Sequence, residues 1–213
     1  MDFSVYSRPN KVKTMLVNNR RAVQVIEPQA LPQPIEVDVV THCHVTPAEV
    51  SALMVDTLEA PTDALTLEPQ AGTGNLIQSL LESGHSINEI VAVERHITLA
   101  QGIEKRFSHL GDTNTAEAQH FNVINECFLD YAATAQGKIE YPRILMNPPF
   151  KQVRAHMKAA LSLLGKAGHD DAILVALVPI TYQHEEAELI DTLSNDTFAL
   201  AKVNTKIIRI WRE

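Results

Sequence analysis

Apolar runs of strand length alternate with amphipathic segments of helix length from residue 46 onward. The first helix is predicted to begin with Thr46 as its N-cap and Pro47 at its first position. Glu49 stands where a capping box places an acid, and the helix is expected to end near Leu58. Further helices are predicted at Asn75 to Ser83, Ile97 to Leu110, Asp130 to Ala135 and Phe150 to Leu164.

Short apolar runs between these helices predict a seven-stranded sheet. The strands are expected at Ala64 to Leu67, Glu89 to Val93, Phe121 to Ile124, Arg143 to Met146, Ala172 to Val178, Phe198 to Val203 and Ile207 to Trp211. Because helices separate the first five strands, these are expected to form βαβ units of a parallel sheet. Only residues 204–206 separate the last two, which predicts an antiparallel hairpin. The fold class is therefore α/β.

The first 45 residues have a different pattern. Four prolines between residues 28 and 47 interrupt any helix, and residues 35–40 alternate like a short strand. Residues 13–17 and 22–26 flank a polar turn and predict a hairpin. The chain is therefore expected to comprise an N-terminal extension, residues 1–45, and one domain, residues 46–213.

Composition supports a globular protein. Of the 213 residues, 45% are hydrophobic and 21% are charged, which suits one ordinary folded domain. No apolar run approaches the roughly 18 residues of a membrane span, and the N-terminus lacks the apolar stretch of a signal peptide. A cytoplasmic location without a membrane partner is expected. Cys43 and Cys127 cannot build a disulfide framework and are expected to be core residues.

The charge distribution is uneven. The formal net charge of -8 argues against a protein that coats nucleic acid by charge alone. Residues 1–26 carry five basic side chains and one acidic one, so this segment is +4 and the rest is -12. The segment is either a basic patch on an acidic body or a solvated arm without a specific partner.

A glycine-rich turn follows the first predicted strand, in the segment Glu68-Pro69-Gln70-Ala71-Gly72-Thr73-Gly74. Its glycines let the backbone approach a ligand at the carboxyl end of a strand. About 20 residues further on, the next strand ends in Glu94, which is placed to accept hydrogen bonds from ribose hydroxyls. Ile77 replaces the third glycine of a dinucleotide site. The pattern indicates a nucleoside-containing ligand, with a tight turn that binds nothing as the alternative.

The tetrapeptide Asn147-Pro148-Pro149-Phe150 directly follows another buried strand. Two consecutive prolines stiffen the backbone and remove two donors, which holds the Asn147 amide and the Phe150 ring in place. An amino nitrogen of a flat substrate can donate to the Asn147 side chain and the Pro148 carbonyl while Phe150 stacks on the ring. The alternative is a proline-stiffened loop with a buried phenylalanine.

Together, these motifs resemble those of class I S-adenosylmethionine-dependent methyltransferases, specifically the amino-methyltransferases with an N-P-P-F/Y signature. The resemblance covers roughly residues 41 to 212 and implies their Rossmann-like fold, with S-adenosyl-L-methionine as cofactor. It implies that the catalytic residues are Asn147, Pro148, Pro149 and Phe150. The cofactor-binding residues that it implies are Thr46, Pro47, Glu68, Pro69, Ala71, Gly72, Gly74, Glu94, Arg95, Cys127, Phe128 and Asn147.

One position departs from this family. An Asp-Phe pair that contacts the cofactor adenine in the family is Cys127-Phe128 here. Either Glu126 or Asp130 takes over the contact, or the affinity for the cofactor is lower than usual.

The order of the motifs resembles that of DNA adenine-N6 methylases, which implies DNA as the substrate. Those enzymes usually add a target-recognition domain, and this chain is expected to have no room for one. The N-terminal 45 residues and loops are expected to recognise the target, or sequence preference is small; a homodimer or a separate recognition subunit is the other arrangement. Lys151, Arg154 and Lys158 recur at helical spacing beside the tetrapeptide, either to hold phosphates or as a solvated face.

The mechanism implied is direct attack of the target nitrogen on the sulfonium methyl, which needs no covalent enzyme intermediate and no metal. Hydrogen bonds to Asn147 and Pro148 would localise the lone pair of an adenine amine. Alternative substrates are adenine in RNA and a glutamine side chain of a protein. A non-catalytic partner subunit is a further alternative. His42-Cys43-His44 is not expected to bind metal, because neighbouring side chains on a strand point to opposite faces.

Overall fold

The computed structural model describes residues 45–107, 110, 121, 123–168, 171–195 and 203–212. The predicted N-terminal hairpin, the predicted strand at residues 35–40, the basic segment and Cys43 lie outside the described residues. Within the described part, no helix is both long and apolar enough to cross a membrane.

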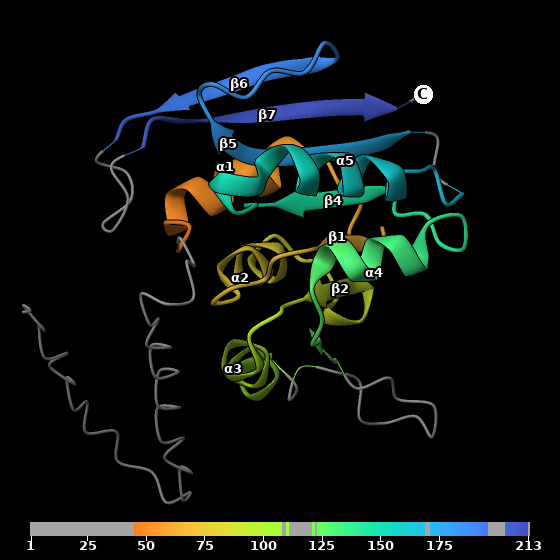
Figure 1. Cartoon of the computed structure of the whole chain (residues 1–213). Helices are drawn as coiled ribbons and strands as arrows, with labels where there is room; N and C mark the ends of the chain where they lie inside the picture. Colours follow the sequence, from red (N-terminus) through yellow and green to blue (C-terminus); the bar gives the residue numbers. More distant parts are fainter. Residues whose placement is uncertain are drawn as a thin grey trace, which may run out of the picture. The chain divides into compact units, whose positions relative to one another are not determined.

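The described residues form a seven-stranded sheet with the order β3-β2-β1-β4-β5-β7-β6 (Figure 1). The strands are β1 (Thr66–Glu68), β2 (Ile90–Val93), β3 (Val123–Ile124), β4 (Arg143–Met146), β5 (Ala172–Pro179), β6 (Ala187–Leu193) and β7 (Thr205–Arg212). The first five pair in parallel, and β7 pairs antiparallel with both β5 and β6. The predicted α/β class, parallel core and C-terminal antiparallel hairpin are confirmed.

The helices lie close to their predicted positions. They are α1 (Ala48–Leu58), α2 (Asn75–Glu82), α3 (Ile97–Phe107), α4 (Phe128–Ala135) and α5 (Val153–Leu163), with 3₁₀ turns η2 (Ile87–Glu89) and η4 (Phe150–Gln152). Apolar residues of α1, α2 and α3 pack in one core, and those of α4 and α5 pack in another. Alternate residues of the buried strand β5 enter the two cores, Val175 the first and Leu174 the second, because successive side chains of a strand point to opposite faces.

The predicted sixth strand at residues 198–203 lies outside the described residues except for Val203, and the structure has a strand that was not predicted at Ala187–Leu193. The partner of β7 is β6, Val203 is not in a strand, and the predicted turn residues Thr205 and Lys206 belong to β7. Residues 196–202 lie outside the described part. The strand β6 escapes a pattern search because it is an edge strand with a register shift between Leu189 and Asp191, which breaks the alternation of apolar and polar positions.

The start of α1 also differs from its prediction. Its N-cap is Pro47, and no side chain caps the helix. The backbone N–H of Ser51 donates to the Pro47 carbonyl at 2.9 Å, so the helix begins one residue later than the capping pattern indicated. The Thr46 hydroxyl is consequently available for a contact outside the helix.

Candidate functional site

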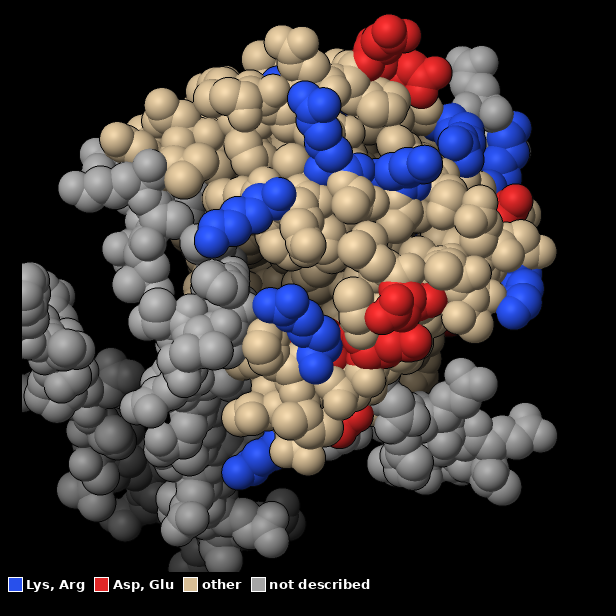
Figure 2. Space-filling view, viewed as in Figure 1, with Lys and Arg blue, Asp and Glu red and all other residues tan. Residues whose placement is uncertain are grey.

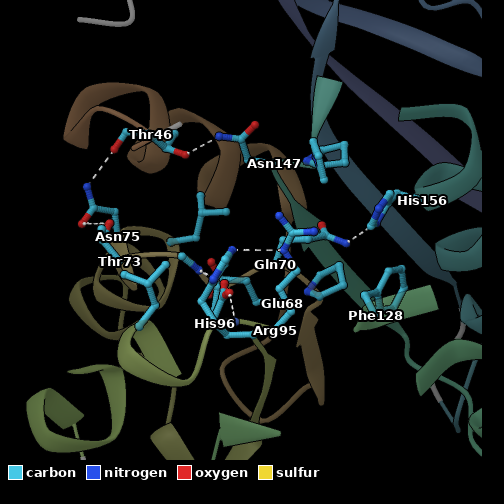
Figure 3. A pocket seen from close by; sticks show the side chains of 18 of the residues that line it. Thr46, Glu68, Gln70, Thr73, Asn75, Arg95, His96, Phe128, Asn147 and His156 are labelled. Atoms are coloured by element: carbon cyan, nitrogen blue, oxygen red, sulfur yellow. Dashed lines mark hydrogen bonds between the residues drawn. The ribbon is translucent and has the colours of Figure 1, made fainter. Parts of the chain in front are cut away.

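A solvent-open pocket of about 890 Å³ lies where the carboxyl ends of β1, β2 and β4 meet (Figure 3). Ligands of open α/β sheets bind at this edge, because the loops that follow parallel strands converge there. Of the residues expected to hold a cofactor, those that line the pocket are Thr46, Glu68, Pro69, Ala71, Gly72, Glu94, Arg95, Cys127, Phe128 and Asn147. Pro47 and Gly74 do not line it. Other lining residues that the sequence did not single out include Thr73, Asn75, His96, Gln152 and His156.

Glu94 connects the end of β2 to the glycine turn. Its carboxylate is buried and accepts the backbone N–H of Gly72 at 2.9 Å and that of His96 at 2.8 Å. Gly72 adopts a φ of 54°, a left-handed conformation that favours glycine. A carboxylate has about four lone-pair positions, so Glu94 retains capacity for hydroxyl donors of a ligand.

Glu68 ends β1 beneath the same turn and is 1% exposed. Burial, reinforced by the charge of Glu94, raises the pKa of Glu68 well above its usual range, although the backbone N–H of Ile77 opposes the shift by hydrogen bonding to the carboxylate. Within the described structure, Oε2 of Glu68 is buried without a hydrogen-bond partner. This oxygen is therefore able to hydrogen-bond to a ligand, as an acceptor when Glu68 is ionised and as a donor when it is protonated.

A chain of hydrogen bonds links the glycine turn to the tetrapeptide after β4. The Thr73 hydroxyl donates to Oδ1 of Asn75 at 3.3 Å, and Nδ2 of Asn75 donates to the Thr46 carbonyl at 2.8 Å. Nδ2 of Asn147 donates to the Thr46 hydroxyl oxygen at 3.0 Å (Figure 3). Three segments far apart in the sequence are thus held in one arrangement.

The tetrapeptide contributes unequally to the pocket. Asn147, Pro148 and Pro149 line it, whereas the half-buried Phe150 begins η4 and is not part of the lining. Because Nδ2 of Asn147 faces Thr46, its Oδ1 points away from Thr46 (Figure 3). A target that contacts Phe150 would therefore approach from beside the pocket rather than from within it.

A second polar cluster lies across the pocket from Thr46 (Figure 3). Nε2 of Gln70 lies 3.0 Å from Nδ1 of His156, and the His156 ring stacks on Phe128 with 6.0 Å between centroids. Burial lowers the pKa of His156, and the positive charge of Arg95 lowers it further. His156 is therefore neutral at neutral pH. The sequence did not indicate this cluster, because His156 stands alone at a helical core position.

The residue before Phe128 does not restore an acidic contact. Cys127 is half-buried and lines the pocket, whereas Glu126 and Asp130 are exposed and do not line it. Within the described residues, no group of three or more His, Cys, Asp or Glu side chains is arranged to hold a metal ion.

The three predicted cations follow the tetrapeptide, but they do not share one helix. Lys151 lies in η4, whereas Arg154 and Lys158 lie one turn apart in α5. All three are exposed. Figure 2 shows Lys and Arg side chains spread over the face on which α5 lies, with some Asp and Glu side chains beside them. This arrangement would suit a polyanionic ligand.

Neither protein-family models nor curated proteins match the chain. Among solved structures, the protein YhhF of Escherichia coli, provisionally named a methyltransferase, superposes with a TM-score of 0.53 at 18% identity over 76% of this chain and 84% of that one. The 23S rRNA methyltransferase ErmE superposes with a TM-score of 0.58 at 17% identity over 78% of this chain and 68% of that one. The chain has the fold of class I methyltransferases.

A methyltransferase subunit of a type I restriction-modification system from Streptococcus thermophilus has the same fold. It superposes with a TM-score of 0.61 at 15% identity over 78% of this chain. The match covers 44% of the subunit, so this chain corresponds to less than half of that protein's length.

Proposed function

We propose that this chain is an S-adenosylmethionine-dependent methyltransferase that acts on the exocyclic amine of adenine, in DNA in preference to RNA. The observation that carries the proposal is the Asn147 amide, held by Thr46 at the rim of a pocket suited to a nucleoside. The fold alone supports many methyl acceptors. An oriented amide followed by two prolines supports an acceptor that presents N–H groups.

The pocket offers the cofactor both hydrogen-bonding side chains and an aromatic ring. Glu68 and Gln70 each place a buried side-chain oxygen without a hydrogen-bond partner in the described structure, and both residues line the pocket. The Gln70 oxygen suits a donor of the cofactor, such as its ammonium, a ribose hydroxyl or its adenine amine, and the Glu68 oxygen accepts when ionised and donates when protonated. Glu94 would accept from the ribose, and Phe128 would contact the adenine ring.

When bound, the cofactor would supply a methyl group on a positively charged sulfur that an amine attacks directly. Asn147 Oδ1 and the Pro148 carbonyl would accept hydrogen bonds from the target amine and localise its lone pair. The amine of adenine is a poor nucleophile because that pair is delocalised into the ring, so positioning supplies most of the remaining rate enhancement. Phe150 would stack on a base flipped out of its helix.

The exposed cations after the tetrapeptide support a nucleic-acid substrate, because phosphate contacts position such targets. A subunit of a type I restriction-modification system shares the fold, which favours DNA. ErmE, named as an rRNA methyltransferase, shares it too, so RNA is the second candidate. A multi-subunit assembly, as in a restriction-modification system, would supply target recognition.

The test is incorporation of a tritiated methyl group from S-adenosylmethionine into unmethylated DNA, total RNA and cell protein, with labelled nucleosides identified by mass spectrometry. The expected product is N6-methyladenine in DNA. Label in RNA or protein would show that the substrate is not DNA and would leave the proposed methyl transfer in place. No label, with the cofactor bound, would favour a non-catalytic partner subunit.

Asn147→Ala is the variant that tests the role of the amide in methyl transfer. We expect it to lose methyl transfer and to keep cofactor affinity within a few-fold, because the main proposed contact of the amide is with the target amine. Asn125→Ala is the control, since Asn125 donates to the Glu94 backbone carbonyl outside the pocket lining. Full activity of Asn147→Ala would remove the proposed role of the amide.

A further inference from the structure

The Thr46 hydroxyl makes a hydrogen bond in the candidate site and does not cap the helix that follows it. Its sequence context predicts an N-cap, yet no side chain caps α1. The hydroxyl oxygen instead accepts from Nδ2 of Asn147, 101 positions away, and the residue is 5% exposed. Residues that leave a local structural role for a distant polar contact are typical of functional sites.

The Thr46 hydroxyl can donate only one hydrogen bond. A threonine hydroxyl has one proton and two lone pairs. In the part of the chain that the structure describes, Asn147 donates to this oxygen and Asn75 donates to the Thr46 carbonyl, so neither takes the hydroxyl proton. Because Thr46 lines the pocket, this proton is available to a hydrogen-bond acceptor of a ligand there.

The Asn147 amide has two orientations towards such a hydroxyl. In the observed one, Nδ2 donates to Thr46 and Oδ1 points away from it. In the opposite one, the hydroxyl donates to Oδ1, and the NH₂ group points away. The second orientation presents donors to a target amine, which is itself a donor, and so opposes binding of the target.

We infer that Thr46 is a positioning residue that couples occupancy of the pocket to the orientation of the Asn147 amide. A ligand that takes the hydroxyl proton leaves Oγ1 able only to accept, so Nδ2 must face Thr46 and Oδ1 must face the target. This inference rests on the proposed function, because S-adenosylmethionine carries a carboxylate that can be such an acceptor. By linkage, cofactor and target each strengthen binding of the other by the same factor.

The first test follows the side-chain amide of Asn147 by NMR, with its signals assigned from their loss in Asn147→Ala. The probe is S-adenosylhomocysteine, which carries the same carboxylate and requires no target. We expect it to slow exchange of the amide protons with water several-fold in the wild type and in Thr46→Ser, which keeps the hydroxyl. Thr46→Val, which has the same shape without a hydroxyl, should show no slowing.

The second test compares kcat and KM for the same variants. Thr46→Val should lower kcat about tenfold at saturating cofactor, the effect of one lost hydrogen bond at the reacting group, and Thr46→Ser should restore it. A hydroxyl that only binds cofactor would raise the KM for cofactor and leave kcat unchanged. Thr57→Val is the control, because this hydroxyl donates to the Leu53 carbonyl within α1 at 2.7 Å.

The outcomes separate the inference from the proposed function. If the wild type binds S-adenosylhomocysteine but methylates nothing, the proposed function fails and amide exchange still decides the inference. If Thr46→Val keeps both the wild-type exchange response and the wild-type kcat, the inference is overturned. Absence of any binding by the wild type would overturn both.

Discussion

The Glu94 carboxylate accepts the backbone N–H of Gly72 at 2.9 Å, which joins the end of β2 to the turn after β1. The same carboxylate accepts from the His96 backbone at 2.8 Å. One buried side chain therefore sets the shape of the turn and presents its remaining lone pairs to the pocket. Its substitution should affect both the turn and the ligand.

Glu94→Gln removes the charge and leaves one accepting oxygen. We expect cofactor affinity to fall about 10- to 150-fold, because a hydrogen bond to a charged acceptor contributes about 1.5–3 kcal/mol. Calorimetry with S-adenosylhomocysteine measures the change. Glu185→Gln, at an exposed position outside the pocket lining, is the control and should bind normally. Equal affinities of the two variants would contradict a role for Glu94 in the site.

Glu68 should make stability depend on pH. Its pKa is raised in the folded protein by burial and by Glu94, so the folded state holds a proton more tightly than the unfolded chain. The stability that this provides is present below the unfolded pKa of about 4.5 and is lost as the pH rises through the folded pKa. Glu68→Gln mimics the protonated form, and we expect it to raise Tm relative to wild type more at pH 8 than at pH 5.

Thermal unfolding of Glu68→Gln and Glu185→Gln at both pH values checks this prediction. Glu185→Gln serves as the control because its side chain is exposed. A Tm difference between Glu68→Gln and wild type that does not change with pH would show that the raised pKa has no effect on stability.

Gly74→Ala should be more destabilising than a left-handed conformation alone explains. Gly74 has a φ of 78°, and an added Cβ would lie 2.8 Å from Cε2 of Phe107 on α3. Gly137 has a φ of 75° and no atom within 4 Å of an added Cβ, so Gly137→Ala isolates the backbone cost of roughly 1–2 kcal/mol. We expect Gly74→Ala to lower the free energy of unfolding by about 1–3 kcal/mol more than Gly137→Ala does. Each kcal/mol corresponds to a decrease in Tm of about 2–4 °C. Equal losses would mean that Phe107 moves freely.

The cations after the tetrapeptide should set the salt dependence of DNA binding. Replacement of Lys151, Arg154 and Lys158 by Gln should raise the KM for DNA and reduce the slope of log affinity against log salt by up to about 3, roughly one for each phosphate that is no longer neutralised. Lys138→Gln is the control and should leave the slope unchanged. Lys138 is exposed and precedes the amino end of β4, whereas the three cations follow its carboxyl end. An unchanged slope in the triple variant would identify these side chains as a solvated face.

Local patterns predicted most of the fold. The strands β1 to β5, the helices between them and the two polar turns follow from hydrophobic spacing and from glycine and proline, which act over a few residues. The strand β6 did not, because its pattern is interrupted by a register shift and its identity depends on pairing with β7. Thr46 was wrongly predicted as an N-cap, because capping patterns consider only the adjacent helix and not distant residues such as Asn147.

The sequence by itself determined which segments carry polar chemistry at strand ends, because those turns must follow their strands directly. The tertiary structure decided which of these side chains meet. The contact of Thr46 with Asn147 spans 101 positions, and that of Gln70 with His156 spans 86. The burial that raises the pKa of Glu68 likewise exists only once the strands pack. Such contacts depend on the order of strands in the sheet, which no local pattern of residues encodes.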